Sequence, residues 1–243
     1  MPGRPRSRGE VLRVRTGWRP IRGASPLLEN ALGSEPRAGL AGKGAPPLIE
    51  SFLLSTVRVS TFAGERLLTA GSGFFFEREQ RLFLVTSRHV LVDEPSGHHP
   101  DRVEIRVHTS TVDLTRSATI SIPLYREGKG IWRHARDSGG EIDVAALPLD
   151  RGALPPDAAV RAFTPAHLQG PLEEIGIGTQ LLVVGFPLGF YDTLHNLPVA
   201  RQAAVASGFG VRFQGQGYFL TNASMHRGPS GAPRRSGPSA ACA

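Results

Sequence analysis

From Ile49 onward, the sequence is a succession of short runs of β-branched and aromatic residues separated by turn residues. Polar and apolar residues alternate within several runs, which is typical of strands with one buried face. Their spacing favours a small antiparallel barrel or sandwich over βαβ units, because no helical stretch separates successive runs. The six predicted strands of this region are Phe52–Phe62, Leu67–Phe76, Arg81–Ser87, Val103–Thr109, Ala118–Ile122 and Asp143–Leu147.

A second β region follows residues 151–178, where repeated prolines disfavour a continuous helix and indicate a connection. Its three predicted strands are Gln180–Phe186, Val199–Ser207 and Gly217–Ala223. Three strands leave an open sheet with an unpaired edge, so we expect the second barrel to be incomplete.

The net charge of +7 resides in the terminal segments rather than in the β regions. Residues 1–48 hold nine Lys or Arg and three Glu, and they lack apolar periodicity. We therefore expect a disordered basic extension there. The predicted organisation is a disordered extension at 1–48, an N-terminal β-barrel at 49–150, a connection at 151–178, a partial C-terminal β-barrel at 179–233 and a disordered tail at 234–243.

Several protein classes are excluded or disfavoured by composition. No apolar stretch is long enough to cross a membrane as a helix. The first thirty residues carry arginines throughout and form no signal-peptide apolar region, so a cytoplasmic location is expected. The only cysteine is Cys242, which excludes an intramolecular disulfide.

Three residues of complementary chemistry lie at predicted strand ends or turns. His89 follows the third strand, Asp143 opens the sixth, and Ser230 lies between glycines after the last. A serine hydroxyl becomes a nucleophile when an imidazole removes its proton, and a carboxylate orients and stabilises that imidazole. The sequence therefore predicts nucleophilic catalysis by Ser230, His89 and Asp143.

Three motifs are similar to those of a known protein family: T-x-x-H-V at Thr86–Val90, D-x-A-x-L at Asp143–Leu147 and G-x-S-G-x-P at Gly228–Pro233. With them, the chain resembles the trypsin-like, chymotrypsin-fold serine peptidases, in particular the disulfide-free bacterial type related to the HtrA proteases. The order His, Asp, Ser is that of the family. Gly71-Ser72-Gly73-Phe74 and Gly185-Phe186-Pro187-Leu188-Gly189 are further likenesses.

The resemblance implies an all-β fold of two antiparallel β-barrels, the second incomplete, and hydrolysis of peptide bonds in a polypeptide substrate through an acyl-enzyme. It implies Ser230 as nucleophile, His89 as general base and acid, and Asp143 as its orienting partner. The amides of Gly228 and Ser230 would form the oxyanion hole, and neither a cofactor nor a metal is needed.

The segment after Pro233 departs from the family, whose members continue with further strands. Ten residues without a strand pattern follow here, which suggests a truncation or frameshift and impaired turnover. An inactive peptidase-like fold that binds peptides or proteins is the alternative function. Nucleic-acid binding by the arginine-rich extension is a third hypothesis, although no specific nucleic acid is expected. The sequence assigns no oligomeric state.

Each motif also has a purely structural interpretation. His89 could be a hydrogen-bonded structural histidine, Asp143 could cap a turn, and Ser230 could belong to an ordinary loop. His98-His99 near Asp101 hints at a metal site, but no further ligand follows at a recognisable spacing, which favours a solvated loop.

Overall fold

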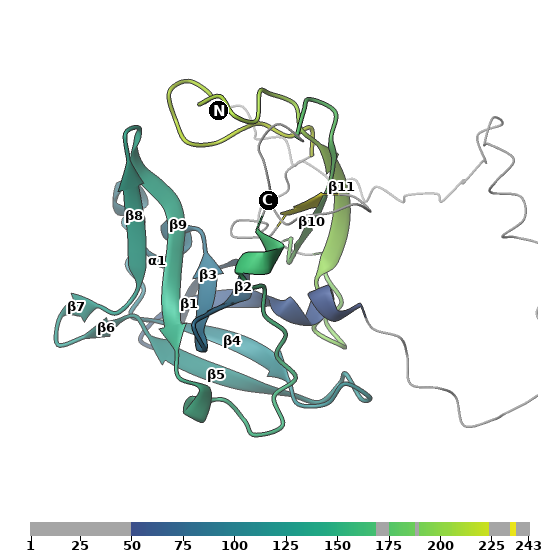
Figure 1. Ribbon diagram of the computed structural model, residues 1–243. Coiled ribbons are helices and arrows are strands. Elements are labelled where there is room, and N and C mark those ends of the chain that lie inside the picture. The colour runs from purple at the N-terminus through teal and green to yellow at the C-terminus, as the bar shows by residue number, and fades with distance from the viewer. Residues whose placement is uncertain (1–49, 169–174, 188–189, 224–233, 237–243) are drawn as a thin grey trace, which may run out of the picture. The chain divides into compact units, whose positions relative to one another are not determined.

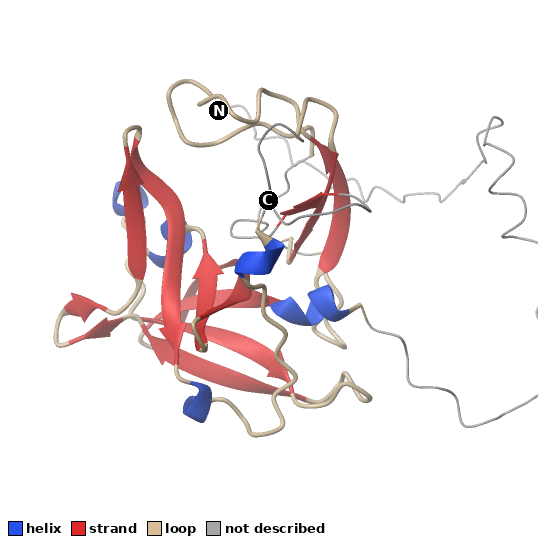
Figure 2. Ribbon diagram, viewed as in Figure 1, coloured by secondary structure: helices blue, strands red, loops and turns tan. Residues whose placement is uncertain are grey.

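The computed structural model describes residues 50–168, 175–187, 190–223 and 234–236. Every described residue belongs to the second of the two units of the chain, residues 46–243. The predicted basic extension at 1–48 lies outside the described residues. Strands dominate the second unit, and the helical elements are single turns (Figures 1 and 2).

The larger sheet is antiparallel and has seven strands in the order β5-β4-β1-β2-β3-β9-β8 (Figure 1). All six strands predicted in the first half contribute to it. The residues that open the first predicted run form a helical turn instead of a strand. The strands are β1 (Thr56–Ala63), β2 (Arg66–Arg78), β3 (Arg81–Thr86), β4 (Arg102–His108), β5 (Ser117–Pro123), β8 (Arg133–Asp137) and β9 (Gly140–Leu149).

Strand β8 and the small ribbon β6 (Tyr125–Arg126) and β7 (Lys129–Gly130) were not predicted. All five β8 residues are exposed, so this edge strand carries no alternation of buried and exposed side chains that a pattern could reveal. Strand β9 begins at Gly140, and Asp143 therefore lies inside the strand rather than opening it, which corrects the sequence prediction.

The core of the larger sheet lies on one face of its central strands. Val59, Phe75, Leu84, Ile105 and Leu147 are at most 1 % exposed. Gly73 sits where two strands approach closely, because a Cβ there would lie 2.8 Å from Cγ2 of Val59 and 3.0 Å from Cδ1 of Leu84. The core is therefore packed too tightly at this point for any side chain.

Short helical turns connect the strands, and among the described residues no helix is long and apolar enough to cross a membrane. The connection that begins at Arg151 runs along the larger sheet, since the Phe163 amide donates to the Phe75 carbonyl at 2.9 Å. The turns are η2 (Ser51–Ser55), α1 (Arg88–Leu91), η3 (Glu94–Ser96), η4 (Arg151–Ala153) and η5 (Pro165–His167).

The smaller sheet has the order β11-β10-β12, with β10 (Gln180–Gly185), β11 (Val199–Ala204) and β12 (Arg234–Ser236). The first two strands were predicted. The strand predicted at Gly217–Ala223 is wrong, because only Thr221 in that segment forms a bridge, to Val205. The third strand is β12 instead, in a segment without a strand pattern, where pairing with β10 supplies the extended structure.

The segment 217–223 folds back on the smaller sheet as a loop. The rings of Phe209 and Phe219 pack edge to face with their centroids 4.7 Å apart. Together with Ile175 they cover a small core whose centre includes Leu181 and Val205. The apolar residues of this segment therefore pack through their rings and do not form a strand ladder.

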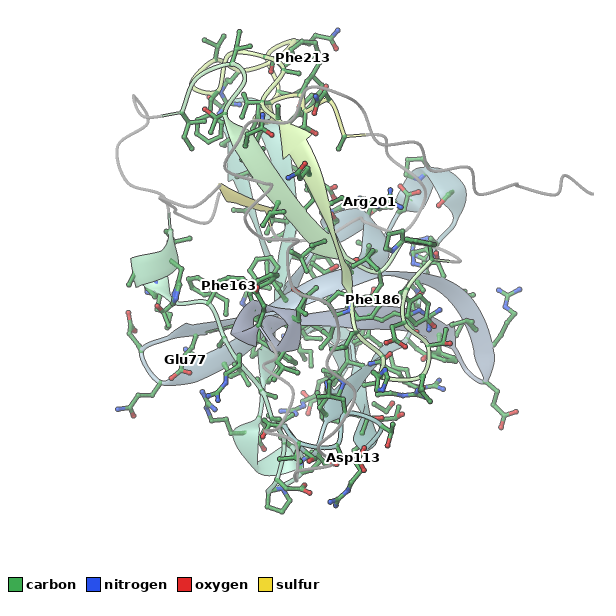
Figure 3. The ribbon with its side chains drawn as sticks, turned by 90° about the vertical axis from the view of Figure 1, so that its right-hand side faces the viewer. Glu77, Asp113, Phe163, Phe186, Arg201 and Phe213 are labelled. Atoms are coloured by element: carbon green, nitrogen blue, oxygen red, sulfur yellow. The ribbon has the colours of Figure 1, made fainter. Side chains whose placement is uncertain are left out.

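Polar contacts of two buried side chains, Ser72 and His108, join the halves of the second unit. The Phe186 amide donates to Oγ of Ser72 at 2.8 Å, and Nε2 of His108 lies 2.6 Å from the His195 carbonyl oxygen. Ser72 is fully buried, and Phe186 is labelled in Figure 3. The two glycine-containing motifs that resembled the peptidase family, around Ser72 and Phe186, thus meet in space.

Candidate active site

His89 projects from α1, the single helical turn that follows β3. Val90 and Leu91 of the same turn are buried and anchor it to the core. The ring of His98 braces it from outside, with Nε2 2.9 Å from the Val90 carbonyl oxygen, so this histidine has a structural contact. The His89 side chain remains 47 % exposed and faces outward beside the anchored turn.

Asp143 reaches His89 because of the strand register. Strands β3 and β9 pair with Thr86 opposite Ala145, so Asp143 lies two residues beyond the last residue of β3, beside α1. Alternation places Asp143 on the same face of β9 as the buried residues Ala145 and Leu147. The carboxylate therefore stands at the rim of the core, where the helical turn begins.

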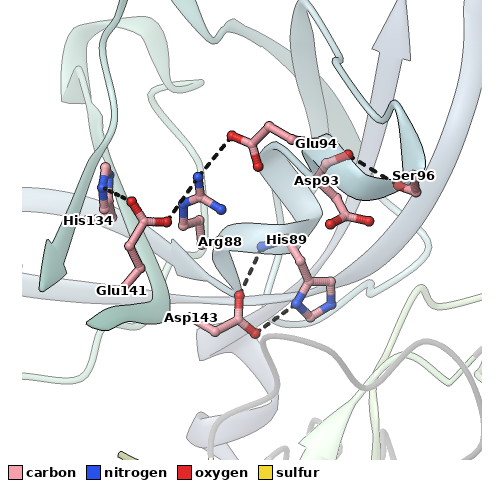
Figure 4. Close-up of polar contacts among 8 residues, drawn as sticks. All are labelled: Arg88, His89, Asp93, Glu94, Ser96, His134, Glu141 and Asp143. Atoms are coloured by element: carbon pink, nitrogen blue, oxygen red, sulfur yellow. Dashed lines mark hydrogen bonds and ion pairs between the residues drawn. The ribbon is translucent and has the colours of Figure 1, made fainter. Parts of the chain in front are cut away.

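Both oxygens of the Asp143 carboxylate contact His89 (Figure 4). Oδ2 lies 2.7 Å from Nδ1 of the ring, and Oδ1 accepts a hydrogen bond of 2.9 Å from the His89 backbone amide. Because a carboxylate can only accept here, Nδ1 carries the proton, and in the neutral ring Nε2 is left as the basic atom. The two contacts fix both the tautomer and the orientation of the ring.

The same contacts shift the pKa of His89 and the pKa of Asp143. The hydrogen bond that the His89 ring donates to Asp143 raises the pKa of His89 above its ordinary value, and partial burial only partly offsets this. For Asp143, partial burial acts to raise the pKa, but the hydrogen bonds from the His89 ring and backbone hold it below its ordinary range. The pair is thus arranged to favour an imidazolium beside a carboxylate.

A model of the trypsin-like peptidase domain family matches residues 71–234, about two thirds of the chain. The chain belongs to this family. The matched region contains His89, Asp143 and the segment Gly228–Pro233. The predicted resemblance and the all-β fold class are therefore confirmed.

A search of curated proteins found no match. Among solved structures, the HtrA-type protease AlgW with tripeptide is similar, with 16 % identity and a TM-score of 0.45 over 76 % of this chain and 48 % of that one. A variant of the same protease with tripeptide gives 15 % identity and a TM-score of 0.45 over 77 % of this chain and 51 % of that one. The chain thus spans about half the length of these structures.

In this trypsin-like peptidase domain, a second ion-pair network ties α1 to β9 (Figure 4). Nη2 of Arg88 lies 3.0 Å from Oε1 of Glu94 and 3.2 Å from Oε2 of Glu141. Glu141 stands two residues before Asp143 on β9. Adjacent residues of α1 are therefore held by alternate residues of β9.

Sequence reasoning predicted His89 and Asp143, and the structure brings them together across 54 positions of sequence. Ser230 and Gly228, the predicted nucleophile and oxyanion-hole residue, lie outside the described residues. The supporting pair Arg88 and Glu141 was missed. The spacing Glu141-Ile142-Asp143 was an available signal, because alternate residues of a regular strand lie on one face.

Proposed function

We propose that this domain is a serine endopeptidase in which His89, Asp143 and Ser230 form the catalytic triad. The observation that carries the proposal is the double contact of Asp143 with the ring and the backbone of His89. A carboxylate held in this way orients an imidazole for proton transfer and stabilises its charged form. The family membership and the position of Ser230 in a G-x-S-G-x-P motif support the third member.

In the acylation half of the reaction, Oγ of Ser230 attacks the carbonyl carbon of the scissile peptide. Nε2 of His89 takes the hydroxyl proton, and the Asp143 carboxylate stabilises the resulting imidazolium. The amides of Gly228 and Ser230 donate to the oxyanion of the tetrahedral intermediate. The C–N bond then breaks as His89 gives its proton to the leaving amine, which leaves an ester on Ser230.

In deacylation, water attacks the ester carbonyl while His89 removes a proton from it. Collapse of the second intermediate breaks the ester C–O bond, and His89 returns the proton to Oγ of Ser230. The acid product departs and the starting protonation state is restored. Peptide and water are the only reactants, so the atoms balance without a cofactor.

The proposed base works only when His89 is neutral. Because Asp143 raises the pKa of His89, activity should increase with pH until the pH passes that raised pKa. In Asp143→Asn, the ring loses the carboxylate that favours its charged form, so the rise in residual activity should move to lower pH.

A fluorophosphonate probe tests the proposal, because it reacts with a serine whose proton is removed by a neighbouring base. We expect labelling of the full chain that is lost in Ser230→Ala and strongly reduced in His89→Ala. Ser121→Ala, at an exposed serine on β5, is the matched control and should label normally. Cleavage of a fluorescently labelled casein should follow the same pattern.

The alternative function, a peptidase-like fold that only binds peptides, predicts a different result. A chain that is folded by circular dichroism, binds peptides, and neither labels nor cleaves would contradict the enzyme proposal. Labelling that persists in Ser230→Ala would contradict the assignment of the nucleophile.

A further inference from the structure

The larger sheet carries charged side chains on the face that does not hold its core. In β1, Val57 and Val59 are buried in the core, so Arg58 and Ser60 point to the other face. The register puts Ser60 opposite Glu104 of β4, and Arg106 of β4 opposite Thr119 of β5. Two neighbouring strands, β1 and β4, thus present Arg58, Glu104 and Arg106 on one outer face, and β5 adds Thr119.

Residues 190–198, in the loop before β11, cover part of this outer face, and a set of hydrogen bonds holds them in a defined conformation. The Asp192 carboxylate accepts hydrogen bonds from the backbone amides of Leu194 and His195, at 3.0 and 3.1 Å, and pairs with the His195 ring at 2.8 Å. The His195 carbonyl oxygen contacts buried His108 of β4. These contacts fix the loop over the strands, so a pocket beneath it is preformed.

A pocket of about 220 Å³ lies between the loop and the outer face. The loop contributes Tyr191 and Asn196, and the strands contribute Arg58, Glu104 and Arg106, with Phe62 and Leu67 as apolar wall. Its volume is on the order of seven water molecules, which suits a group the size of one amino acid. The Arg58 guanidinium lies over the Tyr191 ring, 5.6 Å from its centroid.

Asn196 is the unusual residue of this pocket. Its side chain is only 7 % exposed, and its backbone has a positive φ of 50°. Its Nδ2 is buried and has no hydrogen-bond partner within the part of the chain that the structure describes. Buried amide groups normally have partners, so this donor indicates an acceptor that enters from outside.

The charged side chains that line the pocket identify that acceptor as an anion. Glu104 is engaged by Arg102, with Oε1 3.1 Å from Nη2 and 3.2 Å from Nε. Arg58 donates to Oγ of Ser60 at 3.1 Å, and neither Arg58 nor Arg106 forms an ion pair with any other described residue. Two guanidinium groups and one amide donor therefore line the same pocket, and neither guanidinium is paired with a carboxylate of the described residues.

We propose that this pocket binds a carboxylate attached to an apolar group, as in a small aromatic or aliphatic acid. Arg106 and Arg58 pair with the carboxylate, Nδ2 of Asn196 donates to it, and the apolar group lies against Phe62, Leu67 and Tyr191. The apolar wall distinguishes such an acid from inorganic phosphate. The site is built from β1, β4, β5 and a loop, and it uses none of the proposed catalytic residues.

Nuclear magnetic resonance of the full, ¹⁵N-labelled chain tests the proposal by following the side-chain amide of Asn196. The probes are 3-phenylpropanoate, its neutral amide 3-phenylpropanamide, and inorganic phosphate. We expect 3-phenylpropanoate to shift the Asn196 amide signals and to bind at least tenfold more tightly than the other two. Because no turnover is measured, the result is independent of the proposed peptidase activity.

Two variants and a control locate the binding. Arg106→Gln removes a guanidinium, and Asn196→Asp replaces the donor with an anion of similar shape that a positive φ tolerates. Because Asn196→Asp lacks the side-chain amide, binding to the variants is followed by the backbone amide signals of Tyr191 and of position 106. Each variant should weaken acid binding about tenfold or more, whereas Arg126→Gln, at an exposed arginine on β6, should not. Circular dichroism melting checks that each variant is folded.

Three outcomes would overturn the proposal. Equal affinity for the acid and its amide would show that charge is not recognised, and unchanged affinity in folded Arg106→Gln would place the binding elsewhere. Phosphate binding as tightly as 3-phenylpropanoate would show a site for inorganic anions, in which the apolar wall has no role.

Discussion

The two sheets differ in what each contributes to the candidate site. The larger unit of structure, the seven-stranded sheet and its helical turn α1, holds the hydrogen-bonded pair of His89 and Asp143. Asp143 comes from β9 of that sheet, and His89 comes from α1, which follows β3. The three-stranded sheet belongs to the half that carries Ser230 in the sequence. The contacts of His89 and Asp143 thus depend on the larger core, whereas the smaller core supports none of them.

The largest expected effect is on activity, from Asp143→Asn. The asparagine keeps the shape but can favour the wrong tautomer of His89, so kcat/KM should fall about 10⁴-fold. The control is Asp137→Asn, which alters the carboxylate at the end of β8 that pairs with Arg212. This variant should retain most activity. Rates of casein cleavage measure the effect, and a loss of less than tenfold would exclude Asp143 as the orienting residue.

The second prediction compares the two cores. Leu84 is fully buried in the larger core, and Leu181 is 1 % exposed in the smaller one. Leu84→Ala should lower the free energy of unfolding by about 4 kcal/mol and Leu181→Ala by about 2 kcal/mol, because the smaller core can collapse around the cavity. Urea unfolding measures both, and equal losses would contradict the proposed difference between the cores.

The third prediction uses two glycines. In Gly73→Ala, the new methyl group would meet Val59, Leu84 and the Val85 carbonyl oxygen at 2.8 to 3.1 Å, and it should cost about 2 kcal/mol of stability. In Gly210→Ala, no atom of the described residues lies within 4 Å of the added atom, so stability should change little. An unchanged free energy of unfolding in Gly73→Ala would mean that β1 and β3 can move away from β2 at this point.

The fourth prediction concerns the connection between the halves. Ser72→Ala leaves the buried Phe186 amide without its acceptor, which should cost about 1 to 2 kcal/mol. Thr119→Ala, at an exposed hydroxyl of β5, is the control and should be nearly neutral. Thermal unfolding measures both, and an unchanged melting temperature in Ser72→Ala would show that the contact adds nothing to stability.

The smallest effect is the pH dependence of stability from the His89–Asp143 pair, whose side chains are about half exposed. Its contribution is complete below pH 6.5, the ordinary pKa of histidine, and is lost as pH rises through the raised pKa of His89. On the acid side, it is complete above pH 3.8 and lost as pH falls through the lowered pKa of Asp143.

The difference in urea midpoint between the wild type and Asp143→Asn should therefore be greatest between these limits. A difference that keeps growing above neutral pH, up to the point where His89 is neutral, would contradict the sign of the His89 shift.

Strands with a buried face could be predicted, because alternation of apolar residues is a local property that is visible in single runs. Strand β8 could not, since all its side chains are exposed and its extended form depends on pairing with β9. The same reason explains β12, which is extended through its pairing with β10. The apolar run at Gly217–Ala223 misled the prediction because its rings pack on a loop.

The sequence by itself determined the fold class and nominated His89 and Asp143, because strand periodicity and motif order are written in neighbouring residues. Only the tertiary structure decided that these two side chains meet, through the β3–β9 register that carries Asp143 past the end of β3. The tertiary structure also forms the ion pair between Arg88 and Glu141 and the pocket that Asn196 lines. Contacts between residues far apart in the chain depend on register and loop path, and local patterns carry neither.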